Sequence, residues 1–182
     1  MAIKKIVLFP DEVLTTPTQP VEKINDEIKQ LVQDLIDTMY DAPGIGLAAP
    51  QIGVLKRVAV VDISRDEDEP PELVVMINPE IVASSGEILW EEGCLSFPKV
   101  YAKITRPGQV IMRALDLEGE TFEIDAEELL AVALQHEIDH LDGIMFLEHM
   151  SPLKKRRSLK KYKKVLEDLQ AQENENEEQD IE

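Results

Sequence analysis

Two histidines lie four residues apart in the segment AVALQHEIDHLDG (131–143), and a glutamate directly follows the first of them. On an α-helix, residues spaced by four stack on one face, so the imidazoles of His136 and His140 can reach one metal ion. Glu137 is rotated by about 100° from His136 and can contact a water molecule beside that ion. This H-E-x-x-H pattern is typical of metallohydrolases in which the glutamate is the general base.

The alternative is that these three polar side chains merely decorate a helix. Leu129, Val132 and Ala133 lie one and two turns earlier on the same stripe, so the histidines continue its apolar, inward-facing side. Interior imidazoles need polar partners, and a metal ion supplies one. Because two histidines make an incomplete metal site, a third ligand must come from elsewhere in the chain.

Several residues are candidates for the third ligand. Phe146 stands where metzincin proteases have a histidine, which excludes that family. A zincin-type peptidase would use Glu167, but this residue lies beside a lysine-rich segment on an expected solvated face. His149 follows the helix end and suits a surface or capping role. Cys94, the sole cysteine, follows a glycine in the polar stretch EEGCLSFP (91–98), which fits a ligand better than a core residue.

The elements that position these residues follow an α+β order. Apolar residues at helical spacing between Ile24 and Met39 predict an N-terminal helix. Asp125 and Glu128 form a D-x-x-E start for the histidine helix, and Gly143 suits its end. Strands joined by short turns favour antiparallel pairing, and they are expected at 57–63, 74–82, 86–91, 100–105, 109–116 and 120–124.

A last helix is expected to begin at Ser151-Pro152 and to end near Leu169. The acidic residues 171–182 after it are predicted to be a disordered tail. The expected fold is therefore α+β, with antiparallel β-sheets packed around a central metal-binding helix and with an N-terminal and a C-terminal helix. Residues 1–170 would form a single catalytic domain.

Length and composition favour a single-domain protein of a reducing compartment. The 182 residues suffice for one domain, and a single cysteine suits a reducing compartment. The net charge of −18 argues against non-specific binding to nucleic acid over most of the surface. Neither a signal-peptide core nor an apolar run of membrane-spanning length is present in the sequence. We expect a cytoplasmic monomer that binds neither membrane nor DNA.

Three segments together resemble the peptide deformylase family: GIGLAAPQ (44–51), EGCLS (92–96) and QHEIDHLDG (135–143). Their order and spacing match the family, and so does the opening VLFPDEVL…PV (7–21). The likeness covers nearly the whole chain up to the last helix. It implies one divalent metal ion held by Cys94, His136 and His140, with an open fourth position. Bacterial members use Fe²⁺, and the same ligands suit Zn²⁺, Ni²⁺ or Co²⁺.

The resemblance also implies an activity. The family removes the formyl group from the N-terminal formyl-methionine of new polypeptides and releases formate. Glu137 would be the general base, while the Gln51 side-chain amide and the Leu95 backbone N–H would stabilise the oxyanion. The Gly44–Gly46 backbone would pair with the substrate like an added strand. The full set of substrate-binding residues would be Gly44, Ile45, Gly46, Trp90, Leu129, Val132 and Ala133.

Further positions gain a meaning from the same resemblance. Glu92 and Arg106 match a buried ion pair that braces the cysteine loop in many members. Tyr101 stands where many members carry an arginine that contacts the substrate backbone. Asp139 either orients a histidine or faces solvent.

The segment LKKRRSLKKYKKVLEDL (153–169) reverses the charge of this acidic chain, since eight of its 19 Lys and Arg fall between 154 and 164. Such a run is often only a solvated helix face. Bacterial deformylases dock on the ribosome through their C-terminal helix, however, so the resemblance implies phosphate contacts. The candidate contacts are Lys154, Lys155, Arg156, Arg157, Lys160 and Lys161.

A non-enzymatic ribosome-binding module with a structural metal is the alternative from another class. A closed metal site would need His149 as fourth ligand and would leave Glu137 without a role.

Overall fold

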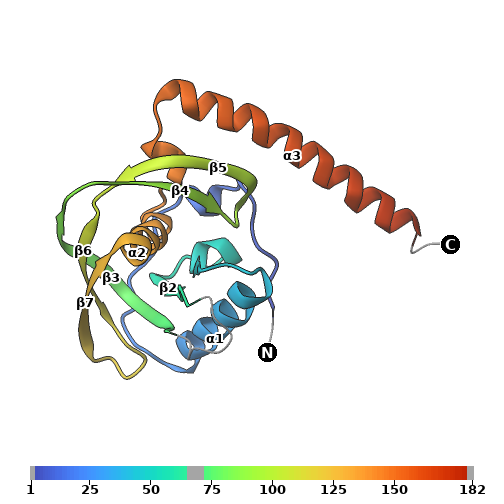
Figure 1. Cartoon of the computed structure of the whole chain (residues 1–182). Coiled ribbons are helices and arrows are strands. Elements are labelled where there is room, and N and C mark those ends of the chain that lie inside the picture. Colours follow the sequence, from blue (N-terminus) through green and yellow to red (C-terminus); the bar gives the residue numbers. More distant parts are fainter. Residues whose placement is uncertain (1–2, 65–71, 180–182) are drawn as a thin grey trace.

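Two antiparallel sheets and three α-helices make up the fold, which confirms the expected α+β class. This computed structural model describes residues 3–64 and 72–179, with the backbone alone for 173–179. The helix α2 lies between the sheets, and α1 covers the other side of the larger sheet's β1–β2 end (Figure 1). None of the helices in this part of the chain combines the length and the apolar character that a membrane crossing needs.

The larger sheet has five strands in the order β1-β2-β3-β6-β7, and every neighbouring pair is antiparallel. β1 was not expected from the sequence, and it forms one edge of this sheet. The other four strands lie close to their predicted positions, although β3 and β7 are longer than predicted. Their bounds are β1 Gly46–Ala48, β2 Val58–Val61, β3 Val74–Ser85, β6 Gln109–Leu115 and β7 Thr121–Glu127.

The second sheet is a long hairpin of β4 (Ile88–Cys94) and β5 (Phe97–Arg106). The hairpin closes at the pair Cys94–Phe97, after a register shift between Glu92 and Cys94. On β5, Phe97, Val100 and Ile104 are fully buried and belong to a core cluster shared with the C-terminal segments. The hairpin therefore brings the only cysteine to the end of a strand that is anchored by core side chains.

The central helix α2 spans Glu128–Leu141, and all eight residues from Ala131 to Ile138 are buried. The chain leaves it at Gly143, where a Cβ would lie 2.9 Å from the backbone of Thr15 and φ is +74°. The expected end of the helix is thus confirmed. The expected D-x-x-E start is wrong, because Asp125 still belongs to β7 and its carboxylate accepts a hydrogen bond from the Gln109 amide.

Helix α1 (Asp26–Asp41) confirms the predicted N-terminal helix. Its first turn is capped by Asn25, whose Oδ1 accepts the backbone N–H of Ile28 at 3.1 Å. The apolar face of α1, including Leu35 and Met39, packs against β1 and β2. This packing fixes the position of the β1 edge.

Helix α3 spans Pro152–Gln179, so the expected end near Leu169 is wrong, and the residues to 179 that were predicted to be disordered are helical. Residues 180–182 of the predicted tail lie outside the described residues. The start of α3 is tied to the body by Tyr162, whose ring stacks on Phe97 with centroids 3.8 Å apart. The Tyr162 hydroxyl donates a hydrogen bond to the carbonyl oxygen of Phe9. Beyond this anchor α3 projects away from the sheets (Figure 1).

Candidate metal centre

Three potential metal ligands converge between the hairpin and α2. The Sγ of Cys94 and one ring nitrogen each from His136 and His140 lie within 4.8 Å of one another. Sγ is 3.2 Å from Nε2 of His140, and the two imidazole centroids are 4.9 Å apart. One thiol and two imidazoles are a donor set that suits zinc and iron-group divalent ions.

Buried aromatic rings fix the turn that carries Cys94. Phe97, which pairs with Cys94 across the turn, is fully buried. Its ring contacts those of Phe9, Phe146 and Tyr162, with centroid distances of 5.6, 5.7 and 3.8 Å. Because four rings from distant parts of the chain meet there, the turn that carries the thiol is held by aromatic packing.

A buried ion pair fixes the orientation of His136. Glu92 Oε2 lies 2.9 Å from Nδ1 of His136, so the opposite ring nitrogen is the one left for a metal ion. Arg106 donates to both oxygens of Glu92, at 2.6 and 2.9 Å. Burial alone would raise the pKa of Glu92, but the hydrogen bonds from His136 and Arg106 outweigh it and lower that pKa to about 2. Glu92 is therefore an anion that holds a proton on Nδ1 of His136.

The two imidazoles differ in their electrostatic surroundings. Burial would lower the pKa of His136, but the hydrogen bonds with Cys94 and Glu92 outweigh it and raise that pKa well above the ordinary value. Burial and then the positive charges of His136 and Arg106 lower the pKa of His140. His140 is therefore kept neutral, which is the form that binds a metal. The residues fit a small divalent cation.

Glu137 lies beside this cluster and is 4% exposed. Its Oε2 has no hydrogen-bond partner among the residues that the structure describes. Burial is the main cause that raises the pKa of Glu137 to about 7. The backbone of β1 approaches so closely that a Cβ on Gly46 would lie 2.4 Å from Oε1 of Glu137. The carboxylate therefore occupies a place that only a glycine at residue 46 leaves open.

Gln51 completes the polar rim of the cluster and is 2% exposed. Its Oε1 accepts a hydrogen bond from the backbone N–H of Ala48 at 2.9 Å. This contact fixes the orientation of the side-chain amide. Nε2 then points towards Ser96 Oγ at 3.2 Å and towards Cys94 Sγ at 3.7 Å. Ser96 is a fully buried contact that the sequence analysis missed, although it lies within the EGCLS segment.

A cavity of about 810 Å³ opens onto the cluster, which is an ordinary size for a ligand site. Tyr101 borders the cavity and packs so closely on Gly93 that a Cβ there would lie 2.6 Å from its ring. Leu95 borders it too, and its Cδ1 lies 2.8 Å from where a Cβ on Gly44 would be. All the apolar and glycine residues expected to bind substrate line this cavity: Gly44, Ile45, Gly46, Trp90, Leu129, Val132 and Ala133.

Three other candidates lie away from the cluster. Glu167 is exposed on α3, and it does not belong to the group of potential ligands found among the described residues. Asp139 is partly exposed, and within the described part of the chain its carboxylate forms no hydrogen bond or ion pair with His136 or His140 but contacts two other residues. Its Oδ2 lies 2.7 Å from Arg106 Nη1 and 2.7 Å from His149 Nε2. His149 is exposed, as expected for a surface residue, but no local pattern in the sequence indicates its contact with Asp139.

Comparison with known proteins gives the family. A family model described as polypeptide deformylase matches residues 3–156. The peptide deformylase of Hydrogenovibrio crunogenus is 52% identical over 161 residues, which cover 88% of this chain and 94% of the relative. A peptide deformylase crystal structure from Legionella pneumophila has a TM-score of 0.86 at 49% identity, and the match covers 93% of this chain and 98% of that chain. A peptide deformylase crystal structure from Ehrlichia chaffeensis in complex with actinonin has a TM-score of 0.83 at 38% identity. The match covers 91% of this chain and 98% of that chain.

An α+β fold with an H-E-x-x-H helix and a cysteine brought to it by a hairpin defines a metal-dependent amide hydrolase. The chain belongs to the polypeptide deformylase family. It removes the formyl group from the N-terminal formyl-methionine of nascent polypeptides, as the resemblance of its three motifs implied. A zincin-type peptidase is not favoured.

The contact between Gly46 and Glu137 gives a first prediction. In Gly46→Ala the new methyl group would displace the Glu137 carboxylate, and we expect formate release from a formyl-Met peptide to slow by about 100-fold, since misplacing a catalytic group by about 1 Å can have that effect. Metal content should be unchanged. Gly108→Ala is the matched control, because its Cβ would come no closer than 3.4 Å to other atoms. Equal activity of both variants would contradict the prediction.

Proposed function

We propose that deformylation by this chain uses Cys94, His136 and His140 as the ligands of one divalent ion, Fe²⁺ in the cell, and Glu137 as the general base. The observation that carries the proposal is the convergence of the three potential ligand atoms beside a buried Glu137 oxygen that has no partner within the described part of the chain. We further propose that residues 1–170 act as a single catalytic domain and that the protein is a cytoplasmic monomer, in keeping with a substrate that is a nascent chain.

The ion supplies Lewis-acid chemistry when bound, because it polarises a carbonyl group and lowers the pKa of water. Glu137 accepts a proton from a water molecule in the cavity through the unpartnered Oε2 and later passes it to the leaving amine. Its raised pKa suits a group that must both accept and release a proton near neutral pH. Glu92 and Arg106 keep His136 in one tautomer and one orientation.

Two donors stabilise the negative charge that develops on the formyl oxygen when the formyl carbon is attacked. The Gln51 side-chain amide is held in the required direction because its oxygen is occupied by Ala48 N–H. We assign the second donor to the backbone N–H of Leu95, which follows the ligand Cys94 and borders the cavity. Donors that are fixed in advance need no reorganisation when charge appears.

The substrate backbone pairs with the segment Gly44–Gly46. β1 is an edge strand whose other side pairs with β2, so its free edge can accept an additional strand. The methionine side chain enters the cavity between Ile45 and the α2 residues Leu129, Val132 and Ala133, with Trp90 on its border. The arginine contact of many family members is replaced here by the exposed ring of Tyr101.

A ligand substitution tests the metal site. Protein prepared without oxygen should contain about one equivalent of Fe²⁺, and Cys94→Ser should lower both this metal content and formate release, because a hydroxyl is a poorer ligand than a thiolate for these ions. Glu167→Gln is the control and should match the unchanged protein. Full metal content in Cys94→Ser, with loss in Glu167→Gln, would instead support a zincin-type site.

A second substitution tests the oxyanion donor. Gln51→Ala should keep its metal and lower kcat by about 100- to 1000-fold, the usual effect of removing one such donor. Gln33→Ala, an exposed amide on α1, is the control. An unchanged kcat for Gln51→Ala would remove this residue from the mechanism.

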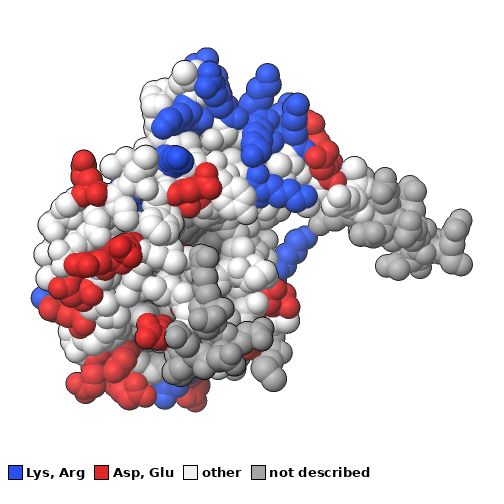
Figure 2. Space-filling model, in the orientation of Figure 1, with Lys and Arg blue, Asp and Glu red and all other residues white. Residues whose placement is uncertain are grey.

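We also propose that the basic residues of α3 bind ribosomal RNA. Lys and Arg gather over α3, while Asp and Glu are spread over the body (Figure 2). Five of the candidate contacts are exposed, and Lys155 is half-buried and paired with Glu148 at 2.6 Å. The buried side of the same helix carries Tyr162 and Val165 in the core. The charged face is therefore free for phosphate contacts that do not disturb the fold.

Point substitutions test this contact better than truncation, because removing α3 would also remove Tyr162 from the core. The double variant Lys160→Gln, Lys161→Gln should bind ribosomes more weakly. The slope of log affinity against log salt should fall by about 1.5, since each phosphate contact contributes about 0.7–0.9. Lys23→Gln, Lys29→Gln changes the net charge equally on an exposed surface near α1 and serves as control. Equal co-sedimentation of both variants with ribosomes would count against the proposal.

A further inference from the structure

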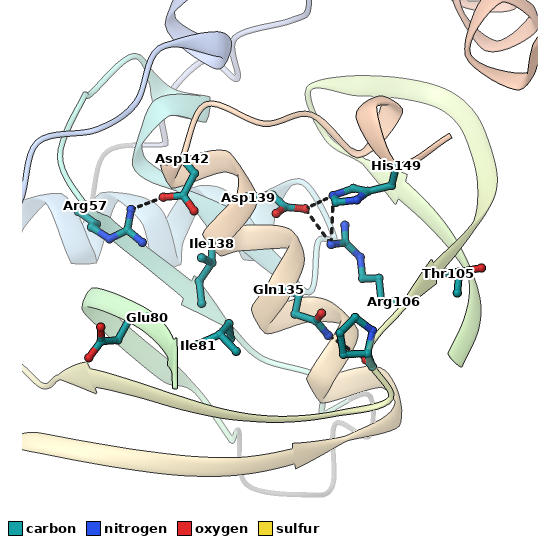
Figure 3. A pocket seen from close by; sticks show the side chains of 11 residues that line it. Arg57, Glu80, Ile81, Thr105, Arg106, Gln135, Ile138, Asp139, Asp142 and His149 are labelled. Carbon is teal, nitrogen blue, oxygen red and sulfur yellow. Dashed lines mark hydrogen bonds and ion pairs between the residues drawn. The ribbon is translucent and has the colours of Figure 1, made fainter. Parts of the chain in front are cut away.

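A chain of ion pairs runs from the metal cluster to the protein surface. Figure 3 shows its outer part, from Arg106 through Asp139 to His149. The Arg106 side chain is only 3% exposed, and its guanidinium bridges two carboxylates. It contacts Glu92 on the side of the metal cluster and Asp139 on the other side, with Nη1 2.7 Å from Asp139 Oδ2. His149 contacts the same Oδ2 through Nε2 at 2.7 Å, and a third of its side chain is exposed.

The members of this chain come from four different elements. Glu92 lies on β4, Arg106 at the end of β5, Asp139 on α2, and His149 on the short helical turn Phe146–His149. Since the ligand Cys94 is on the hairpin and the ligand histidines are on α2, Arg106 ties together the two elements that must converge. His149 contacts Asp139, the outer of the two carboxylates that Arg106 bridges.

We propose that His149 is a positioning residue for the metal centre, acting through Asp139, Arg106 and Glu92 on the ligand His136. This inference rests on the proposed role of His136 as a metal ligand. Nε2 of His149 carries a hydrogen that it donates to the Asp139 carboxylate. This donation holds Asp139 in the rotamer that also accepts from Arg106.

A cavity beside Asp139 explains why the additional donor is needed. The cavity measures about 400 Å³, and Asp139, His149 and Arg106 all border it (Figure 3). Without His149, the Asp139 carboxylate could rotate into this cavity and be hydrated there. Arg106 would then lose one of its two buried counter-ions and would be free to shift with Glu92. Glu92 alone would then compensate the buried guanidinium, so the Arg106–Glu92 pair would rearrange together with His136.

A second ion pair on the same cavity provides an internal comparison. Asp142, the residue that follows the end of α2, pairs with Arg57. Among the described residues, neither of the two forms a hydrogen bond or ion pair with Arg106 or His149. A change at Asp142 therefore alters the cavity wall without touching the chain that leads to His136.

Co²⁺-loaded protein provides the test, because its ligand-field absorption bands report the geometry of the metal site directly. His149→Phe keeps a ring but removes the donor. We expect shifted bands, metal release to a chelator faster by about tenfold and a lower kcat at unchanged KM, as for other residues that support a ligand. His149→Gln restores an N–H donor and should restore most of each property. Asp142→Asn should match the unchanged protein.

The route of the effect is tested in the Asp139→Asn background. If His149 acts through the Asp139 carboxylate, His149→Phe should add nothing further to the release rate there. Unchanged bands and release in folded His149→Phe, or a full additional effect in the Asp139→Asn background, would overturn the proposal. Metal content and formate release of the unchanged protein are measured alongside, so a failure of the proposed metal site would be recognised separately.

Discussion

The burial of α2 is the constraint on which the rest of this structure depends. Every side chain from Ala131 to Ile138 is buried, and three of these residues, Gln135, His136 and Glu137, are polar. Polar groups in such a position destabilise a protein unless they have partners. Gln135 is satisfied by carbonyl oxygens, whereas His136 depends on Glu92 and on the cluster with Cys94. The surrounding sheets therefore serve to bring partners to this helix as well as apolar surface.

The hairpin β4–β5 meets that requirement because it is fixed at both ends. At its turn, Phe97 packs among aromatic rings from the N-terminal segment and α3. At its open end, Arg106 joins Glu92 to Asp139 of α2. Packing and ion pairing act on opposite ends of one element, so Cys94 is held close to the two histidines without depending on a single contact.

Long periodic segments and chemically specific motifs could be predicted from the sequence. The helix around Leu31–Met39 and the inward face of α2 follow from apolar spacing. The three motifs indicate the family, and they contain the three potential metal ligands that converge in the structure. Local patterns failed where tertiary contacts decide the structure. β1 has only three residues, all buried, so it lacks the alternation of apolar and polar residues by which a strand is predicted. Asp125 resembles a helix cap but continues β7, because a strand partner was available to it.

The contacts of Asp139 and His149 could not be predicted from the sequence for a different reason. Their partner Arg106 lies 33 residues before Asp139 in the chain, and no spacing rule connects such positions. The extension of α3 beyond Leu169 also escaped prediction, since composition alone suggested an unstructured tail. In both cases the chemistry of single residues was visible, but their neighbours in space were not.

Charge is distributed unevenly along the chain. Residues 1–153 carry 29 Asp and Glu against 11 Lys and Arg, the segment 154–164 carries eight cations and no acidic residue, and residues 165–182 carry the remaining eight Asp and Glu. At long range a polyanion repels this protein, whose net charge is −18. Within a Debye length of about 8 Å the nearest charges dominate, so in the proposed ribosome contact only an approach led by residues 154–164 would be attractive. A polyanion would then turn the molecule until this segment faces it, and the proposed contact would select one orientation of the body.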